Sequence, residues 1–325
     1  MPRILLTTTS YQDTPGPHHD LLAKSGLEVV RDRGPLQEAR LLELIQKHGG
    51  FDGLLNGDDL ITAKVIDAAL AAPTKLRVIA KYGIGLDSID VAHATAKKLP
   101  VLFTPGVNHT TVAEHAFLLM LMLAKVIVPQ ANSVKAGQWK RITGIELAGK
   151  TLGVIGLGRI GKEVAKRGKA FDMSVVAFDP YWDGAFAWEQ KLTRAYSEAE
   201  VATQCDVLSL HMNLTDANRR MINKDFIAKM RNKAMIINTA RGGLVHEADI
   251  AQACKEGKLW GYGTDVLEHE PIQAPHPFQG VDNIVVTPHV GSRTFESVER
   301  QAVRATLNLV NFLKGDKDYI QANKL

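Results

Sequence analysis

The segment KTLGVIGLGRIG, residues 150–161, constrains the fold more strongly than any other part of the chain. An apolar, β-branched run at 151–155 leads into three glycines spaced as G-x-G-x-x-G, and apolar residues at helical spacing follow. In such a strand–turn–helix unit the first glycine permits a tight turn, the second lets the backbone approach a pyrophosphate, and the third lets the helix pack closely on the sheet. Free N–H groups at the helix start favour phosphate binding. The segment therefore predicts a dinucleotide site built on Gly156, Gly158 and Gly161.

An acidic residue supports this interpretation. The next β-run, residues 174–178, ends in Asp179, where a carboxylate can accept hydrogen bonds from two ribose hydroxyls. The same charge would repel a 2′-phosphate, so the sequence favours NAD over NADP. A glycine turn in an unrelated α/β protein is the alternative, and the joint presence of strand, helix and acid argues against it.

The rest of the chain alternates apolar β-runs with helical patterns, which predicts parallel sheets. The β-runs of the first region are 3–7, 26–30, 51–55, 76–80 and 101–104, and those of the second are 151–155, 174–178, 207–210, 234–238, 259–264 and 283–287. We expect an α/β fold with two doubly wound parallel-sheet domains.

Two breaks in the pattern suggest how these domains are connected. Thr104-Pro105-Gly106 indicates a first crossing between domains, and a final helix over about 294–313 can return to the first domain. This predicts a substrate domain made of 1–103 and 292–325, with a Rossmann domain of 104–291 inserted into it. A long helix is expected at 111–128, continuing toward 137. Its segment 116–128 is too apolar to be solvated and too short to span a bilayer, so we expect it in a core or at a subunit interface.

Composition excludes several classes of protein. Hydrophobic residues make up 45% and charged residues 23%, and the net charge of +4 comes from interspersed acids and bases. No basic run predicts a nucleic-acid partner, and no Cys/His spacing predicts a metal site. The N-terminus lacks the pattern of a secretory signal. The two cysteines, Cys205 and Cys254, are expected to be reduced and buried, so we expect a cytoplasmic protein without a membrane partner.

Polar residues follow the β-runs of the second region directly. The carboxyl ends of parallel strands line the ligand crevice of an open sheet, so one cleft is expected to collect these residues. Strands often end in polar residues for solvation alone, which explains part of the pattern. The residues are Gly156, Asp179, His211, Arg241, Asp265 and His289.

Three residues form a plausible set for hydride transfer. Arg241 can hold a substrate carboxylate by two parallel hydrogen bonds. His289 suits proton transfer near neutral pH, and Glu270 can orient its imidazole and stabilise the protonated form. Each could alone be an ordinary loop residue, but their joint placement beside a nucleotide site favours a function.

Six segments, in this order, resemble the NAD-dependent D-isomer-specific 2-hydroxyacid dehydrogenases and, within them, the phosphoglycerate dehydrogenase-like branch. They are KYGIGLDSID (81–90), PGVNHTTVAEH (105–115), GVIGLGRIG (153–161), NTARGGLV (238–245), TDVLEHEP (264–271) and TPHVGS (287–292). The resemblance implies a Rossmann domain inserted into a flavodoxin-like substrate domain, a homodimer, NAD as cofactor and a small-molecule 2-hydroxy or 2-oxo acid as partner.

The resemblance also implies roles for individual residues. Arg241, Glu270 and His289 would be catalytic, with His289 as the proton donor and acceptor. Arg241 would also bind substrate, together with Tyr82, Gly83, Ile84, Gly85 and Asn108. The cofactor would contact Gly156, Gly158, Arg159, Ile160, Gly161, Asp179, His211, Thr215, Thr239, Ala240, Asp265 and His289.

Two departures from the family pattern affect these expectations. The segment His211-Met212-Asn213-Leu214-Thr215 lacks the proline that the family often has, so the loop is less restrained. The segment Asn56-Gly57-Asp58-Asp59 carries two acids where phosphoglycerate enzymes typically have arginine. We therefore expect a small polar hydroxy acid without a phosphate. The alternatives are an NAD(H)-sensing regulator of the same fold and a Rossmann enzyme with another nucleotide.

Overall fold

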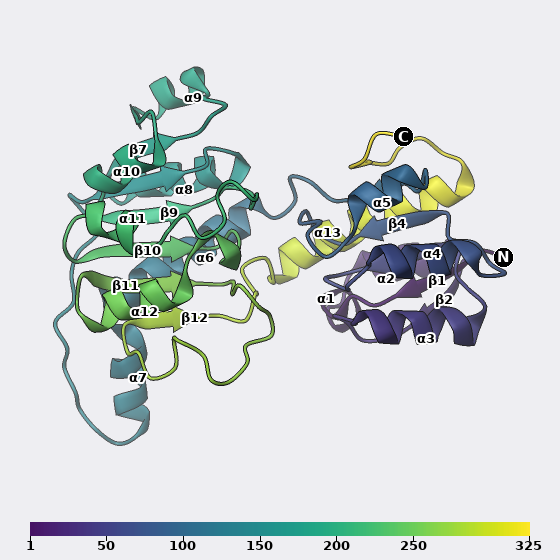
Figure 1. Ribbon diagram of the computed structural model, residues 1–325, viewed down its shortest axis with the longest axis horizontal. Coiled ribbons are helices and arrows are strands. Elements are labelled where there is room, and N and C mark those ends of the chain that lie inside the picture. The colour runs from purple at the N-terminus through teal and green to yellow at the C-terminus, as the bar shows by residue number, and fades with distance from the viewer. The chain divides into compact units, whose positions relative to one another are not determined.

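The computed structural model describes residues 1–325 and divides into two compact α/β units (Figure 1). The first unit contains residues 1–108 and 293–325, and the second contains residues 109–292. The sequence analysis places these crossings at 103/104 and 291/292, five residues and one residue earlier. The unit with the glycine motif is thus one continuous segment, whereas the other is assembled from both ends of the chain.

Five parallel strands form the sheet of the first unit, in the order β2-β1-β3-β4-β5. This is the order of flavodoxin-like folds. The strands are β1 (Arg3–Leu6), β2 (Glu28–Arg31), β3 (Gly53–Asn56), β4 (Val78–Lys81) and β5 (Val101–Leu102). The helices are α1 (Thr9–Asp13), α2 (Pro17–Ala23), α3 (Glu38–His48), α4 (Ala63–Ala71), α5 (Val91–Ala96) and α13 (Phe295–Lys314).

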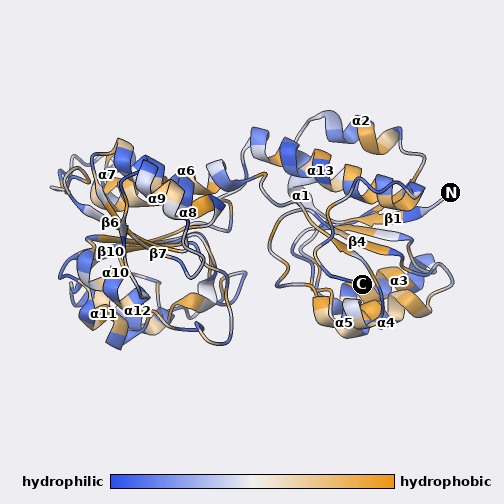
Figure 2. Cartoon of the chain, turned by 90° about the horizontal axis from the view of Figure 1, so that it is seen from above, coloured by the Kyte–Doolittle hydropathy of each residue, from blue (hydrophilic) through white to orange (hydrophobic).

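Apolar side chains fill both faces of this sheet, because strands covered on both sides must be apolar throughout. Helices α3, α4 and α5 cover one face, and α1, α2 and α13 cover the other (Figure 2). Helix α13 inserts Ala302, Ala305 and Leu309 against Ile4 and Val78. The C-terminal segment is therefore part of this core.

Seven parallel strands form the second sheet, in the order β12-β11-β10-β9-β6-β7-β8. Counted from β6, its first six strands have the order 3-2-1-4-5-6, which defines the Rossmann fold. The strands are β6 (Thr151–Ile155), β7 (Ser174–Phe178), β8 (Thr193–Arg194), β9 (Val207–Leu210), β10 (Ala234–Asn238), β11 (Leu259–Thr264) and β12 (Ile284–Val286). The expected pair of doubly wound domains is confirmed.

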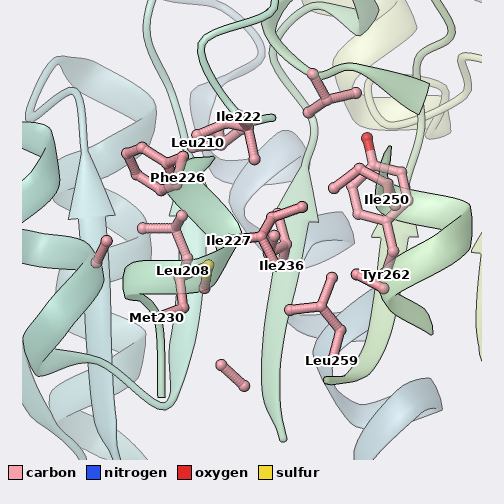
Figure 3. Packing of buried hydrophobic residues seen from close by; sticks show 14 of the residues in the cluster. Leu208, Leu210, Ile222, Phe226, Ile227, Met230, Ile236, Ile250, Leu259 and Tyr262 are labelled. Atoms are coloured by element: carbon pink, nitrogen blue, oxygen red, sulfur yellow. The ribbon is translucent and has the colours of Figure 1, made fainter. Parts of the chain in front are cut away.

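Two apolar layers cover the Rossmann sheet. One face carries α6 (His109–Ala124) and α8 (Arg159–Ala170). The other carries α10 (Glu198–Gln204), α11 (Lys224–Lys229) and α12 (Glu247–Lys255), and Figure 3 shows Phe226 and Ile227 of α11 packed beside Leu208 and Ile236 of the strands. Helices α7 (Ile127–Lys135) and α9 (Gly184–Glu189) and the 3-10 turn η1 (Gly242–Leu244) complete the unit.

The long helix expected from 111 to 137 is interrupted. Helix α6 ends at Ala124, Val126 has a φ of +50°, and α7 begins at Ile127. The N–H of Ile145 donates to the Ala124 carbonyl, and Gln130 Nε2 donates to the Lys125 and Val126 carbonyls. These distant groups satisfy the carbonyls that the break releases. No single helix is long and apolar enough to cross a membrane, and although α6 and α7 pass that test together, the pair bends by 70°.

Candidate active site

The predicted polar residues of the second unit lie at one edge of its sheet. Each follows the carboxyl end of a strand, and the strands β12, β11, β10, β9, β6 and β7 are consecutive neighbours. Along this edge the residues come in the order His289, Asp265, Arg241, His211, Gly156 and Asp179. The edge crosses the point between β9 and β6 where the strand order reverses, which is where open α/β sheets bind ligands.

The glycine turn after β6 is closely packed at two of its three glycines. Gly156 has a φ of +94°, and a β-carbon on Gly161 would lie 1.9 Å from the Gly156 carbonyl oxygen. Gly158 precedes α8 with a φ of −72°, and a β-carbon there would meet nothing within 4 Å. Gly158 and Arg159 are exposed, and Ile160 is half-buried. The first and third glycines are thus required by the fold, whereas the second leaves room for a ligand.

Asp179 supports the glycine turn directly. Its Oδ2 accepts the N–H of Leu157 at 2.6 Å, and its Oδ1 accepts the N–H of Tyr181 at 2.7 Å. Each carboxylate oxygen has two lone pairs, so both can still accept a ribose hydroxyl. The acid that the sequence assigns to the ribose therefore also orders the phosphate-binding turn.

The middle of the edge is lined by less accessible groups. The imidazole Nε2 of His211 lies 2.8 Å from Ser209 Oγ, and burial lowers the pKa of His211 from 6.5 to about 3, so the ring is neutral. Thr239 Oγ1 is buried and has no hydrogen-bond partner, and Ala240 follows it. Thr215 is exposed, and its N–H donates to Asn218 Oδ1. The orphaned Thr239 hydroxyl is available to a ligand at this edge.

Arg241 sits on a turn that β10 and a glycine define. Asn238 Nδ2 donates to the Arg241 carbonyl at 2.9 Å, and Arg241 Nη1 donates to the Ala240 carbonyl at 2.6 Å. A β-carbon on Gly242 would lie 1.9 Å from the Leu267 carbonyl carbon. Only glycine lets this turn pack on the loop that carries Glu270.

His289 and Glu270 form a direct pair. His289 Nδ1 lies 2.7 Å from Glu270 Oε2, while Glu270 Oε1 accepts the N–H of Leu267 at 2.9 Å. Glu247 of α12 accepts the N–H of Glu268, and its carboxylate lies 3.2 Å from His276 Nε2. Glu247 therefore holds the loop that contains Glu270 on both sides of that residue. The side chains of His289 and Glu270 are 46% and 36% exposed. The pair is thus ordered, and its exposed surface leaves it accessible to a ligand.

Asp265 is the buried acid of the site. It is 4% exposed and accepts hydrogen bonds from Thr287 Oγ1 at 2.6 Å and from the N–H groups of Val290 and Gly291 at 2.9 and 2.7 Å. Burial by itself would raise its pKa, but the hydrogen bonds from His115, Thr287 and the two N–H groups lower the pKa below its usual value. Asp265 is therefore ionised at neutral pH.

His115 and Thr287 are two further residues of the site that no sequence pattern singles out. His115 Nε2 lies 2.8 Å from Thr287 Oγ1, although 172 positions separate the two residues. Both belong to segments that carry the family resemblance, but contact between them is visible only in three dimensions.

The substrate residues predicted in the first unit lie after β4. Tyr82 donates its N–H to the Asn56 carbonyl, and burial raises the pKa of its phenol, which stays protonated. Gly83 has a φ of +127°, and its N–H donates to Thr104 Oγ1 at 3.0 Å. The amide of Gly83 is therefore already engaged, and among the predicted substrate residues Ile84 and Gly85 are the better backbone donors to a substrate carboxylate. Asn108 Oδ1 is buried without a partner.

The two acids after β3 have different roles. Asp59 is fully buried and accepts hydrogen bonds from Thr7 Oγ1, Leu36 N–H and Gly57 N–H. Asp58 is 72% exposed and lies 2.6 Å from Nζ of Lys81, a side chain that is itself 3% exposed. Asp58 is therefore the acid exposed to a ligand after β3, whereas the carboxylate of Asp59 is engaged inside the unit.

Comparison with known proteins identifies the family of the chain. The family model described as the D-isomer specific 2-hydroxyacid dehydrogenase, NAD binding domain, matches residues 117–291. A D-3-phosphoglycerate dehydrogenase of Archaeoglobus fulgidus is 38% identical over 91% of this chain, and the chain spans 55% of that protein's length. A hydroxypyruvate reductase of Thermotoga maritima is 38% identical over 87% of this chain and 90% of its own.

A solved structure shows the same fold. The D-lactate dehydrogenase of Aquifex aeolicus, determined with NAD and lactic acid, has a TM-score of 0.84 and 27% identity, with 99% of this chain and 100% of that chain covered. Fold and sheet edge thus define a two-unit α/β protein with a dinucleotide-binding unit. The chain belongs to the D-isomer-specific 2-hydroxyacid dehydrogenase family.

The residues present fit NAD. The open space at Gly158, the exposed start of α8 and the orphaned Thr239 hydroxyl suit a pyrophosphate and its neighbours, and Asp179 suits an unphosphorylated ribose. No group of three or more His, Cys, Asp or Glu side chains is arranged to hold a metal ion.

Proposed function

We propose that this protein is an NAD-dependent dehydrogenase that interconverts a D-2-hydroxy acid and its 2-oxo acid. The observation that carries the proposal is the His289–Glu270 pair at the sheet edge that also bears the glycine turn. A proton-transfer group and a dinucleotide turn on one edge are what hydride transfer to a carbonyl requires.

The proposed mechanism assigns one task to each residue. Arg241 holds the substrate carboxylate and polarises the carbonyl oxygen. Because Glu270 occupies Nδ1 of His289, the reaction proton passes through Nε2. In the reductive direction protonated His289 donates to the carbonyl oxygen, and in the oxidative direction the neutral ring accepts the hydroxyl proton. A dinucleotide held at the glycine turn and Asp179 would provide the redox chemistry, as NADH donating a hydride to C2 of the 2-oxo acid or as NAD accepting one from C2 of the hydroxy acid.

The charges after β3 and β4 favour a small polar substrate without a phosphate. The ammonium of Lys81 is already paired with Asp58, so it does not offer an uncompensated positive charge to a phosphate. The relatives include both phosphoglycerate dehydrogenases and reductases of hydroxypyruvate and glyoxylate. We place this chain's substrate with the second group.

A substrate panel tests the proposal. NADH oxidation is followed with glyoxylate, hydroxypyruvate and phosphohydroxypyruvate, and the reverse reaction with glycerate and phosphoglycerate. We expect turnover of the non-phosphorylated acids, a loss of about 10²–10⁴-fold in His289→Ala, and little change in the matched control His93→Ala. Fast turnover of phosphorylated substrates alone would contradict the proposed substrate.

The same panel separates the alternatives. NADH binding without turnover of any acid would favour the NAD(H)-sensing regulator, and absence of NADH binding would favour another nucleotide. A fluorescence titration with NADH measures the binding directly.

We also propose a cytoplasmic homodimer. Apolar side chains of α6, α7 and the segment after them are exposed, among them Leu118, Ile127, Val134 and Trp139. Both cysteines are free and buried, and the absence of a disulfide is the usual pattern of proteins in a reducing compartment. Light scattering after size-exclusion chromatography tests the dimer, and cell fractionation tests the location.

A further inference from the structure

The backbone of His289 adopts a conformation that needs support. Its φ is +52°, in the left-handed region that side-chain-bearing residues rarely occupy. Such a conformation persists only when surrounding contacts determine it. The hydrogen bonds around residues 287–291 must therefore hold this backbone conformation.

Asp265 provides that support on both sides of His289. The His289 N–H donates to the Asp265 carbonyl at 3.0 Å, and the next two N–H groups, of Val290 and Gly291, donate to its carboxylate. A β-carbon on Gly291 would lie 2.8 Å from Asp265 Oδ2, so glycine is needed for this approach. The orientation of the Asp265 carboxylate thus determines the path of the chain through His289.

Two further side chains orient Asp265. Thr287 Oγ1 lies 2.6 Å from Asp265 Oδ1, and His115 Nε2 lies 2.8 Å from the same hydroxyl and 3.4 Å from the same carboxylate oxygen. Asp265 is ionised and can only accept, so the single hydroxyl proton of Thr287 goes to it. The His115 Nε2–H must then donate to the hydroxyl. The shortest hydrogen bonds thus run from His115 through Thr287 to Asp265, and the longer contact of His115 with the Asp265 carboxylate joins the two ends of this network.

We propose that His115 and Thr287 are positioning residues for the reaction. They act through Asp265 on the backbone of His289 and so align its imidazole with Glu270 and the substrate. His115 belongs to α6, whose other buried side chains are almost all apolar, and its side chain is only 12% exposed. A buried polar side chain at this place is explained by the network that it completes.

Kinetics of matched variants test the proposal, which rests on the dehydrogenase activity proposed above. Thr287→Val removes the hydroxyl with little change in shape, and Thr287→Ser restores it. We expect kcat for 2-oxo acid reduction to fall about tenfold in Thr287→Val and in His115→Phe, with KM for NADH within about twofold of the wild type. Thr287→Ser should recover most of kcat, and the control His93→Phe, which breaks a histidine–aspartate contact in the other unit, should not change it.

The double variant tests whether the two residues act together. If they form one unit, His115→Phe combined with Thr287→Val lowers kcat no further than the more impaired single variant. The proposal is overturned if the kcat losses of the two single variants multiply in the double variant. An equal loss of kcat in Thr287→Ser and Thr287→Val would also overturn it.

Hydrogen exchange supplies a readout that needs no substrate. We expect faster exchange in a peptide covering residues 284–292 in Thr287→Val and His115→Phe, but not in Thr287→Ser or His93→Phe. If no acid is turned over by the wild type while this pattern is seen, the proposed dehydrogenase function fails and the support of the His289 backbone stands. Unchanged exchange in Thr287→Val and His115→Phe overturns the network itself.

Discussion

Nδ1 of His289 lies 2.7 Å from Oε2 of Glu270, and the second oxygen of the same carboxylate accepts the N–H of Leu267. The carboxylate is therefore fixed at one oxygen by its own loop and presents the other to the imidazole. The two residues follow different strands of the sheet, so the contact depends on the fold of the whole unit.

The first prediction concerns this pair. In Glu270→Gln the protonated imidazole loses its negatively charged partner, so a smaller fraction of His289 is protonated at a given pH. The pH optimum of 2-oxo acid reduction should therefore move to lower pH, as measured by kcat/KM against pH. The matched control is Glu268→Gln, which removes a carboxylate of the same loop that pairs with Arg220. An optimum shared by wild type and Glu270→Gln would argue against the pair.

The second prediction separates the roles of two glycines. Gly158→Ala adds a methyl group where the protein leaves open space, so the fold should keep its stability while Kd for NADH rises by about tenfold or more. Gly161→Ala places the methyl against the Gly156 carbonyl and should lower both thermal stability and NADH binding. Thermal melts and fluorescence titrations of both variants check this difference. Equal stability losses would show that the turn is packed differently.

The third prediction concerns cofactor choice. Asp179→Asn keeps an oxygen that can accept a backbone N–H but removes the charge that repels a 2′-phosphate. The preference for NADH over NADPH, measured as the ratio of kcat/KM values, should fall by about tenfold, or ~1.4 kcal/mol. Asp183→Asn is the control, because Asp183 lies four positions later and pairs with Lys162. An unchanged preference in Asp179→Asn would indicate that another group excludes the phosphate.

The fourth prediction concerns acid stability. The pKa of His211 is about 3 in the folded protein because the ring is buried, against 6.5 for an ordinary histidine. Below pH 6.5 the unfolded chain binds this proton and the folded chain does not, so the free energy of unfolding falls as the pH is lowered toward 3. The contribution approaches about 1.4 kcal/mol per pH unit.

Denaturant unfolding between pH 7 and pH 4 measures that slope. The variant His211→Gln cannot take up the proton, so its free energy of unfolding should decline less steeply with falling pH than that of the wild type. Parallel slopes would mean that His211 is not the buried neutral base described here.

The position of the predicted cofactor residues at one sheet edge could be inferred from the sequence for a physical reason. The turn at Gly156–Gly161 and the acid Asp179 depend on residues close together in the chain, and the strand-end rule brings His289 and Arg241 to the same edge. What it could not predict depends on contacts between distant segments. The break after Ala124 is accompanied by a hydrogen bond from Ile145, 21 positions later, and the burial of Asp59 depends on Thr7 and Leu36.

Two contacts in the candidate site could not be predicted from the sequence for the same reason. The Gly83 N–H is engaged by Thr104, which no local pattern reveals. His115 meets Thr287 across 172 positions, and an isolated histidine in an apolar helical pattern gives no signal of that contact.

The discontinuity of the first unit has a consequence for biosynthesis. During translation every residue of the Rossmann unit, through Ser292, is synthesised before α13. The first unit needs α13 to cover one face of its sheet. Until α13 emerges, the apolar side chains of Ile4, Leu6 and Val78 lack that cover. The unit whose translation begins first is thus the last to complete its core. A chain truncated before α13 would keep the nucleotide-binding unit, but the sheet of the first unit would expose apolar side chains and be prone to aggregation.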